Sequence, residues 1–210
     1  YFNGSGQLNF ADYRTSYILQ LRSTEVYRDL GAWYHIVANY DCSIGSPTAK
    51  LYVNGSEVTY STQTIYSQNA TTSWNTDYIF NIGRGTNLGG NEFDGVMSDL
   101  YFVQGYTYDA STFGETDTTT GAWKPKLDPT INYGGTGGNS CHLKFENSAN
   151  MDLDSGSNNL TLTTTGTLSQ TKDCPSHNFS TLNPLVRLAS GSNAYSQGAN
   201  TFTDASGSYN

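Results

Sequence analysis

The chain has 210 residues, of which 13% are charged, and its formal net charge is −8. This acidic balance argues against a nucleic-acid partner, which needs clustered Lys and Arg, and no apolar run approaches the ~20 residues of a membrane span. The abundant Gly, Ser, Thr and Asn disfavour helices, whereas 16 Tyr and 9 Phe supply the bulk of a core. The composition therefore predicts an all-β protein.

Strand-like runs alternate with turn residues from the N-terminus onward. "YFNGSGQLNF" (1–10) predicts a hairpin that turns at Gly-Ser-Gly, and "SYILQLRS" (16–23) predicts the next strand. "AWYHIVANYD" (32–41) carries large side chains on both of its sides, which predicts a central strand covered on both faces. We expect His35 to be a buried strand histidine with a bonded ring nitrogen, since no Ser or Cys nucleophile motif accompanies it.

The next two strands are joined by the strongest turn signal in the chain. Asn54-Gly55 separates "LYV" from "SEV", and this dipeptide favours a type I′ hairpin because both central residues need positive φ. "DYIFNIGRG" (77–85) predicts a further short strand. "NLGGNEFDGVMSDLYFVQG" (87–105) breaks at its paired glycines and is then expected to run as one long strand.

The character of the sequence changes after a helical turn predicted at "DASTFGE" (109–115), with Asp109 or Ser111 as its cap. "HLKFEN" (142–147) and "NLTLTTTGTL" (159–168) are strand-like. We expect three regions: a β-sandwich at 1–126, a β-hairpin region at 127–181 that completes or extends it, and a linker or start of a further β domain at 182–210.

The three cysteines are Cys42, Cys141 and Cys174. They contain no C-x-x-C element, so no zinc site is predicted. We expect three unpaired thiols, because the set is odd and sparse, and a Cys141–Cys174 bridge is the alternative.

"NMDLDSGSNN" (150–159) is the one candidate metal site. Asp152, Asp154 and Asn158 offer hard oxygen ligands of the kind that calcium prefers, but the segment lacks a closing bidentate Glu. The favoured alternative is a tight turn in which Asp154 accepts local backbone N–H groups ahead of Gly156. The sequence therefore requires no cofactor, and calcium stays open.

The first half of the chain resembles a known family. "AWYHIVANYD", the "KLYVNG" hairpin, "YIFNIGRG" and "FDGVMSDLYFVQG" occur in the order found in laminin-G-like, concanavalin A-like jelly-roll domains. The resemblance covers about residues 1–108 and implies an antiparallel jelly-roll β-sandwich with additional C-terminal β segments. Such domains have further strands before the position of Tyr1, so we expect the sandwich to be N-terminally incomplete.

The second half is similar to a tract of tail-fibre and other virion proteins of marine bacteriophages. Phe113–Asp117, Trp123–Lys126, Asp154–Asn159 and Asn178–Leu185 carry this similarity. It implies an extracellular virion protein, a tail fibre or similar appendage, that attaches to host cell-surface polysaccharide without inserting into a membrane. The implied partners are other virion proteins and further copies of the chain in a homo-oligomer such as a trimer.

Lectins stack apolar sugar faces on aromatic rings and bind the hydroxyls with polar side chains. Five aromatic residues in or near predicted loops are candidates: Trp74, Tyr60, Tyr66, Tyr106 and Tyr108. Trp74 is the first to test, and the alternative is that it covers a sandwich edge.

The fold also includes glucanases, which use paired carboxylates in an E-x-D-x-x-E strand. Glu92 and Asp94 match the first half of this pattern, but Met97 stands where the second Glu belongs. We therefore expect a non-enzymatic attachment module. The alternative is a protein that decorates a capsid or fibre without binding sugar, and a polysaccharide depolymerase is the least favoured reading.

Overall fold

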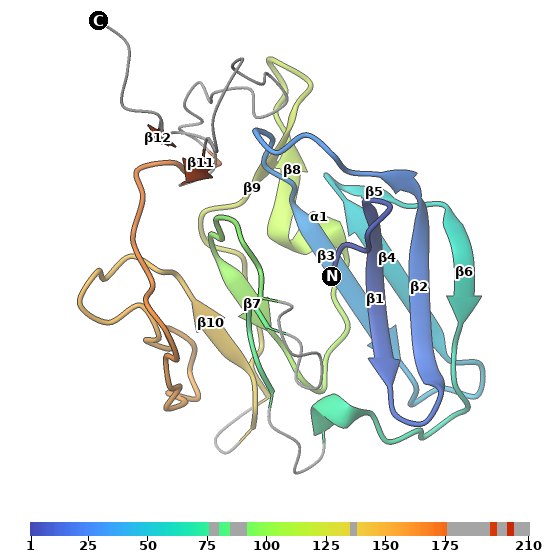
Figure 1. Cartoon of the computed structure of the whole chain (residues 1–210). Coiled ribbons are helices and arrows are strands. Elements are labelled where there is room, and N and C mark those ends of the chain that lie inside the picture. The colour runs from blue at the N-terminus through green and yellow to red at the C-terminus, as the bar shows by residue number, and fades with distance from the viewer. Residues whose placement is uncertain (76–79, 85–91, 135–137, 176–193, 197–200, 204–210) are drawn as a thin grey trace, which may run out of the picture. The chain divides into compact units, whose positions relative to one another are not determined.

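The computed structural model covers residues 1–210, of which we describe 1–75, 80–84, 92–134, 138–175, 194–196 and 201–203. These residues form antiparallel strands, one α-helical turn, α1 (Ala110–Phe113), and one 3-10 turn at Ser73–Asn75 (Figure 1). The predicted all-β class is confirmed. No helix within the described ranges is both long and apolar enough to cross a membrane.

The chain divides into two compact units whose segments alternate along the sequence. Unit 1 comprises Tyr1–Arg28, Tyr34–Phe93 and Tyr106–Ile131, and unit 2 comprises Asp29–Trp33, Asp94–Gly105 and Asn132–Asn210. The region boundaries at residues 126 and 181 stay predictions, and the second of them lies outside the described residues.

Two three-stranded sheets form the body of unit 1 and appear as two layers in Figure 1. The first has the order β1 (Gln7–Tyr13), β2 (Tyr17–Val26), β6 (Tyr60–Thr64), and the second has the order β3 (Ile36–Asp41), β4 (Thr48–Val53), β5 (Ser56–Glu57). Between them lies a cluster that we call the leucine core: Leu8, Leu19, Leu21, Ala49, Leu51, Val53 and Val58. Each fully buried leucine contributes roughly 1.5–3 kcal/mol, so this cluster holds the sheets together.

A further hairpin follows α1 in unit 1. It consists of β8 (Gly114–Thr116) and β9 (Trp123–Pro125), which pair from Gly114↔Pro125 to Thr116↔Trp123. The N-terminal predictions are also confirmed, because residues 1–10 turn through Gly6 and β2 begins at Tyr17.

The strand covered on both faces is β4, and the prediction that 32–41 would be that strand is wrong. The strand in that segment, β3, begins only at Ile36, whose side chain is 41% exposed. In β4, Leu51 and Val53 face the leucine core, while Tyr52 packs on the opposite side against α1. The reason is topological: β4 lies between two neighbours in its sheet and receives the helical turn above it, whereas the described residues give β3 only one neighbouring strand.

The Asn-Gly turn between β4 and β5 is confirmed. Asn54 has a φ of 49° and Gly55 a φ of 82°, as a type I′ turn requires. Asn54 also fixes the chain that enters β3, because its Oδ1 accepts the His35 N–H at 2.9 Å and its own N–H donates to the His35 carbonyl at 2.8 Å.

Unit 2 contains two short antiparallel pairs. β7 (Leu100–Phe102) pairs with β10 (Cys141–Leu143), and β11 (Ala194–Ser196) pairs with β12 (Thr201–Thr203). The buried ring of His142 stacks on Tyr101 with centroids 3.9 Å apart, and its Nε2 lies 3.3 Å from Asp99 Oδ1.

Two predicted strands in this unit are shorter than expected. The long strand within 87–105 is reduced to β7, because Asp99 adopts a φ of 50° just before it. The strand expected at 142–147 is reduced to β10, and Phe145 has a φ of 57° two residues beyond its end. The strand predicted at 77–85 is not present in its described residues, 80–84, which contain only an isolated bridge from Arg84 to Glu92; residues 77–79, 85 and 87–91 lie outside the described residues.

The prediction of a strand at 159–168 is wrong. This segment has no regular secondary structure, and Asn159 and Gly166 have φ values of 50° and 90°. Left-handed residues at both ends of the run prevent an extended strand, although its Thr and Leu content favours one.

Candidate functional site

The side of the β3–β4–β5 sheet that faces away from the leucine core carries most of the polar groups that we consider as a site. The register pairs Val37 with Tyr52 and Asn39 with Lys50. Alternation therefore places these four side chains on one face, together with Glu57, which pairs with Tyr52. We call this surface the outer face of the second sheet.

The apolar half of this outer face is covered by the chain that follows it. Val37 and Tyr52 pack with Ala110 of α1, and Phe113 and Trp123 lie against them. The Tyr52 hydroxyl donates to Asp109 Oδ1 at 3.1 Å. Burial, followed by the hydrogen bond to Asp109, raises the pKa of Tyr52.

Asp109 stands at the predicted N-cap position of α1 but does not cap the helix with its side chain. Its carboxylate is used by Tyr52 instead, because the sheet and the helical turn meet at this residue. On the same face, Lys50 Nζ lies 3.6 Å from Glu57 Oε2. Neighbouring Tyr52, followed by Glu57, raises the pKa of Lys50, so this lysine is a cation at neutral pH.

Tyr106 and Tyr108 lie beside this polar row. Asn39 Nδ2 donates to the Tyr108 carbonyl at 2.9 Å, which ties the segment to β3. The two tyrosine rings are 6.4 Å apart at an interplanar angle of 26°, and Tyr108 packs edge-on against Phe113 at 5.9 Å. Tyr106 keeps 48% of its surface exposed. Tyr106 is thus an exposed aromatic ring on a segment that Asn39 anchors to the outer face of the second sheet, and exposed aromatic rings with nearby polar side chains are typical of saccharide sites.

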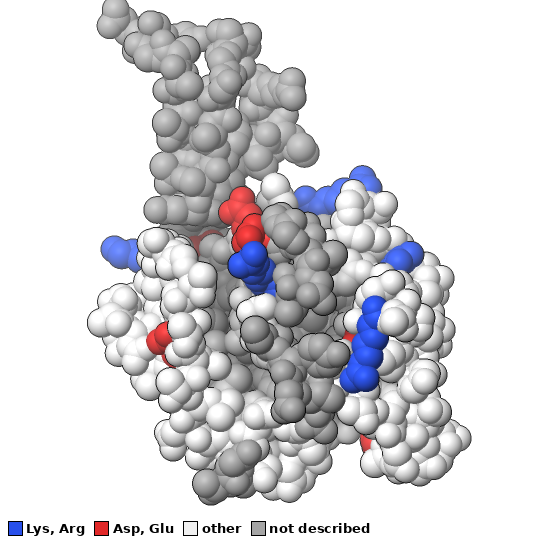
Figure 2. Space-filling model, turned by 60° about the horizontal axis from the view of Figure 1, so that its bottom comes forward, with Lys and Arg blue, Asp and Glu red and all other residues white. Residues whose placement is uncertain are grey.

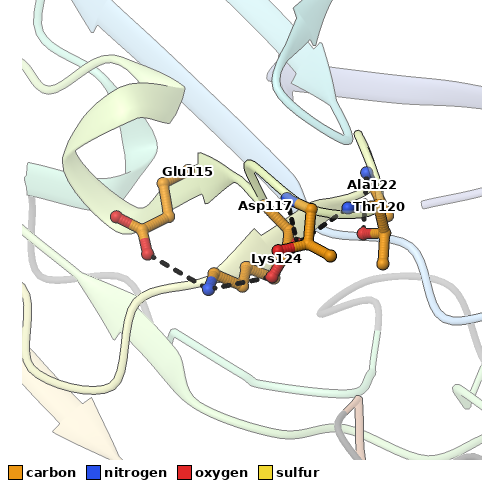
Figure 3. Close-up of polar contacts among 6 residues, drawn as sticks. Glu115, Asp117, Thr120, Ala122 and Lys124 are labelled. Atoms are coloured by element: carbon orange, nitrogen blue, oxygen red, sulfur yellow. Dashed lines mark hydrogen bonds and ion pairs between the residues drawn. The ribbon is translucent and has the colours of Figure 1, made fainter.

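The β8–β9 hairpin is built by its own polar contacts (Figure 3). Asp117 Oδ1 accepts the N–H groups of Thr119 and Thr120, both at 2.9 Å, and Lys124 Nζ lies 3.2 Å from Asp117 and 3.5 Å from Glu115. The backbone N–H groups, together with Lys124, lower the pKa of Asp117 to about 2. The stretches at 113–117 and 123–126, which resemble virion proteins in sequence, therefore form one hairpin, and these contacts stabilise it.

Trp123 is the residue by which this hairpin closes over the sheet. Its indole lies between Gly55 of the β4–β5 turn and Gly114 at the start of β8, where a Cβ at either glycine would overlap the ring. Two glycines that are far apart in the sequence thus make the slot for one side chain.

Two of the predicted aromatic residues belong to the fold rather than to an open surface. Trp74 stacks on Phe10 with centroids 4.9 Å apart and packs on the leucine core, as the sandwich-edge alternative requires. The Tyr60 hydroxyl accepts the Leu51 N–H at 3.0 Å and donates to Glu57 at 2.9 Å. Burial, aided by Glu57 and opposed by the Leu51 N–H, raises the pKa of Tyr60 to about 12.

Tyr66 is 50% exposed, but no ring contact joins it to the other four candidates in the described part of the chain. Of the five, only Tyr106 and Tyr108 are brought together. Asn39, Lys50, Tyr52 and Asp109 were missed by the sequence analysis. Counting back from the Asn-Gly turn along β4 places Lys50 and Tyr52 on one face, so that signal could have found these two, whereas the register of Asn39 depends on the longer β3–β4 loop.

The residues of the calcium hypothesis make hydrogen bonds with other groups. Asp154 is 5% exposed, and its carboxylate accepts three backbone N–H groups, from His142 at 2.9 Å and from Gly156 and Leu160 at 2.8 Å. These are bonds of the kind that the turn alternative requires. Asp152 accepts from Thr164 instead. Among the described residues, no group of three or more His, Cys, Asp or Glu side chains could hold a metal ion.

The cysteines, the two acidic residues of the glucanase pattern and the basic residues do not form a site either in the part of the chain that the structure describes. Cys141 and Cys174 are not joined by a disulfide, and burial, followed by the Asp154 charge, raises the pKa of Cys141 to about 11. Glu92 is exposed and lies 3.6 Å from Arg84, and Asp94 is also exposed. Figure 2 shows Lys and Arg as separate patches on the face in view, with no continuous basic surface there.

His35 makes the stability of unit 1 depend on pH. Its ring lies 5.8 Å from Trp123 and bonds the Phe113 backbone, while its Nδ1 is buried and unpaired among the described residues. Burial lowers the pKa of His35 below its ordinary value of 6.5, despite the bond to Phe113. As the pH falls, the unfolded chain therefore binds a proton at His35 before the folded chain does, which favours unfolding. The stability that neutral His35 contributes to unit 1 is complete above pH 6.5 and is lost below it.

We expect urea unfolding to show a decrease in stability between pH 7.5 and pH 5.5 that is smaller in His35→Gln. The matched control is His142→Gln, since His142 lies in the other unit. An identical pH profile for wild type and His35→Gln would contradict this assignment.

The first 110 residues match a known family. The model described as the concanavalin A-like lectin/glucanases superfamily, Laminin_G_3, matches residues 1–110, just over half of the chain. Comparisons with curated proteins and with solved structures give no match. The matched segment contains both sheets of unit 1 and ends at the first residue of α1.

Proposed function

Because the chain belongs to the concanavalin A-like lectin/glucanases superfamily, we propose that it is a non-enzymatic module that attaches to host-surface glycans. The observation that supports this most is the exposed Tyr106 ring, held beside Tyr108 and the polar outer face of the second sheet. Tyr106 would stack on the apolar face of a sugar, while Asn39, Lys50 and Asp109 would bind its hydroxyl groups.

The biological setting that we propose is a bacteriophage tail fibre or similar virion appendage, working outside cells. Its support is the similarity of the stretches at 113–117, 123–126 and 154–159 to virion proteins, and these stretches form ordered turns and strands in both units. Other virion proteins and further copies of this chain are the proposed partners. The stretch at 178–185 lies outside the described residues.

A purely structural role is the second candidate, and one observation favours it. Trp74, Tyr60 and Trp123, three of the largest candidate sugar-binding or motif side chains, are engaged in packing. A protein that decorates a capsid or fibre would need these contacts and no sugar. Depolymerase activity is a third reading, because the superfamily name includes glucanases, and release of reducing ends from host polysaccharide would establish it.

We expect Tyr106→Ala to weaken binding to a neutral polysaccharide about tenfold, since an aromatic contact of this kind contributes about 1–1.5 kcal/mol. The measurement is an array of bacterial O-antigen and capsular polysaccharides, followed by titration of the best neutral ligand. Tyr66→Ala is the matched control, because Tyr66 is equally exposed but lacks the paired ring. Folded wild type that stays silent across the array would favour the structural role, and equal losses in both variants would remove Tyr106 from the site.

A further inference from the structure

Three exposed tyrosines lie in or beside the first sheet of unit 1. Tyr1 and Tyr13 are each 60% exposed and Tyr17 is 39% exposed. Tyr13 and Tyr17 flank the β1–β2 turn, and their rings meet edge-on with centroids 5.0 Å apart. Large exposed aromatic rings are costly to leave in water, so a cluster of them indicates a surface that meets a ligand.

Tyr1 reaches across this surface. Its carbonyl accepts the Asn9 N–H at 2.8 Å, which sets the residue beside β1. Its N-terminal ammonium group also donates to the Asn9 carbonyl at 2.9 Å, so Tyr1 and Asn9 form a doubly bonded pair and their side chains lie on the same face. Because Asn9 pairs in turn with Arg22, Tyr1 shares this face of the sheet with Arg22.

The same face of β2 carries hydrogen-bond donors that have no acceptor among the described residues. The register pairs Asn9 with Arg22 and Ala11 with Gln20, so alternation places Gln20 and Arg22 on the face that points away from the leucine core. Gln20 is 4% exposed, yet its Nε2 has no hydrogen-bond partner among the described residues. A buried amide donor without a partner is unfavourable, and a ligand oxygen would supply its missing acceptor.

Arg22 supplies the charge of this surface. Its Nε donates to Asn9 Oδ1 at 3.0 Å, and within the described part of the chain its two Nη groups make no hydrogen bond. The carboxylate of Asp12 is buried and accepts the backbone N–H and the hydroxyl of Ser73, and alternation along β1 places it on the other face from Asn9 and Arg22. The outer face of the second sheet differs, since Glu57 and Asp109 accompany its single lysine there.

We propose that Tyr1, Tyr13 and Tyr17, with Gln20 and Arg22, form a second saccharide-binding surface that takes a carboxylate-bearing sugar chain. The rings stack on the pyranose faces, and the Arg22 guanidinium and the Gln20 amide donate to the sugar carboxylate and its neighbouring hydroxyl. Donors without acceptors match an acidic ligand, whereas the carboxylates on the outer face of the second sheet match a neutral one. The role of this second surface in attachment rests on the proposed function, but the experiment that tests it does not depend on Tyr106.

The test is calorimetric titration of the whole chain with oligogalacturonate and with a neutral galactose oligosaccharide of the same length. We expect oligogalacturonate to bind and added salt to weaken it, with Tyr17→Ala and Arg22→Gln each lowering its affinity about tenfold. Tyr106→Ala should leave it unchanged. Arg84→Gln is the matched charge control, because Arg84 is exposed and pairs with Glu92 instead. Thermal unfolding confirms that each variant is folded.

The outcomes separate the two sites. No binding of oligogalacturonate, or equal binding by wild type, Tyr17→Ala and Arg22→Gln, overturns the second surface. Binding of the neutral oligosaccharide that depends on Tyr106 would leave the proposed function intact in that case. Loss of oligogalacturonate binding in Tyr106→Ala also overturns the inference, since it would place both sugars at one site.

Discussion

Trp123→Ala is expected to lower the free energy of unfolding by about 3 kcal/mol, at the low end of the range for tryptophan truncation because the residue keeps partial exposure. The indole fills the slot between Gly55 and Gly114 and lies over Val37 and Tyr52. Its removal leaves a cavity that the β4–β5 turn and β8 are too constrained to fill. Urea denaturation followed by circular dichroism measures the loss.

The two glycines provide the control for this prediction. Gly114→Ala has no unfavourable φ to adopt, yet its Cβ would overlap the indole, so we expect a loss of about 1–3 kcal/mol. In the Trp123→Ala background the same change should cost much less, because the overlapping ring is gone. Additive losses in the double variant would contradict the proposed slot.

Asp154→Ala is expected to destabilise unit 2 by about 3 kcal/mol or more. The substitution leaves three buried or partly buried N–H groups, of His142, Gly156 and Leu160, without their acceptor, and each such group costs about 1–3 kcal/mol when some relaxation is allowed. Thermal unfolding of the whole chain should show the loss in one transition or in the less stable of two.

Asp152→Ala is the matched control, since Asp152 accepts only the exposed contacts from Thr164, and we expect a loss below about 1 kcal/mol. The same pair of variants distinguishes the turn from calcium. A melting temperature that rises with added calcium in wild type, but not in Asp154→Ala or Asp152→Ala, would sink the turn interpretation in favour of a metal site.

Much of unit 1 could be predicted because its signals are local. Asn-Gly between two β-rich runs requires positive φ at both residues, and the hairpin appears where the dipeptide stands. Alternating apolar residues in β2 and β4 place Leu19, Leu21 and Leu51 in the core. Even α1 was indicated by its position after Asp109, although the role of that aspartate was not.

Unit 2 was harder to predict because its geometry depends on contacts between distant residues. Leu and Thr favour a strand at 159–168, but the Leu160 N–H is bound by Asp154 and the chain turns at Asn159. β7 is short because Asp99 leaves the extended region. Tertiary hydrogen bonds overrode β propensity in both places.

The candidate site shows a similar division. A tyrosine in a loop-like context looks the same in sequence whether it is exposed or buried, so Tyr60 and Tyr106 could not be told apart. The exposed Tyr13 and Tyr17 are not predicted as site residues, because they lie in strands, where a tyrosine is expected to pack rather than to meet a ligand. Side-chain register, rather than residue type, separates the two classes.

The slot between Gly55 and Gly114 also sets an order of events during synthesis. The two sheets leave the ribosome long before Trp123 does, so nascent unit 1 carries Val37 and Tyr52 uncovered until the β8–β9 hairpin arrives. Contacts that span so much sequence form late and slowly. The apolar surface of Val37 and Tyr52 is therefore covered completely only after residues 110–123 have been synthesised, and until then it is accessible to neighbouring chains.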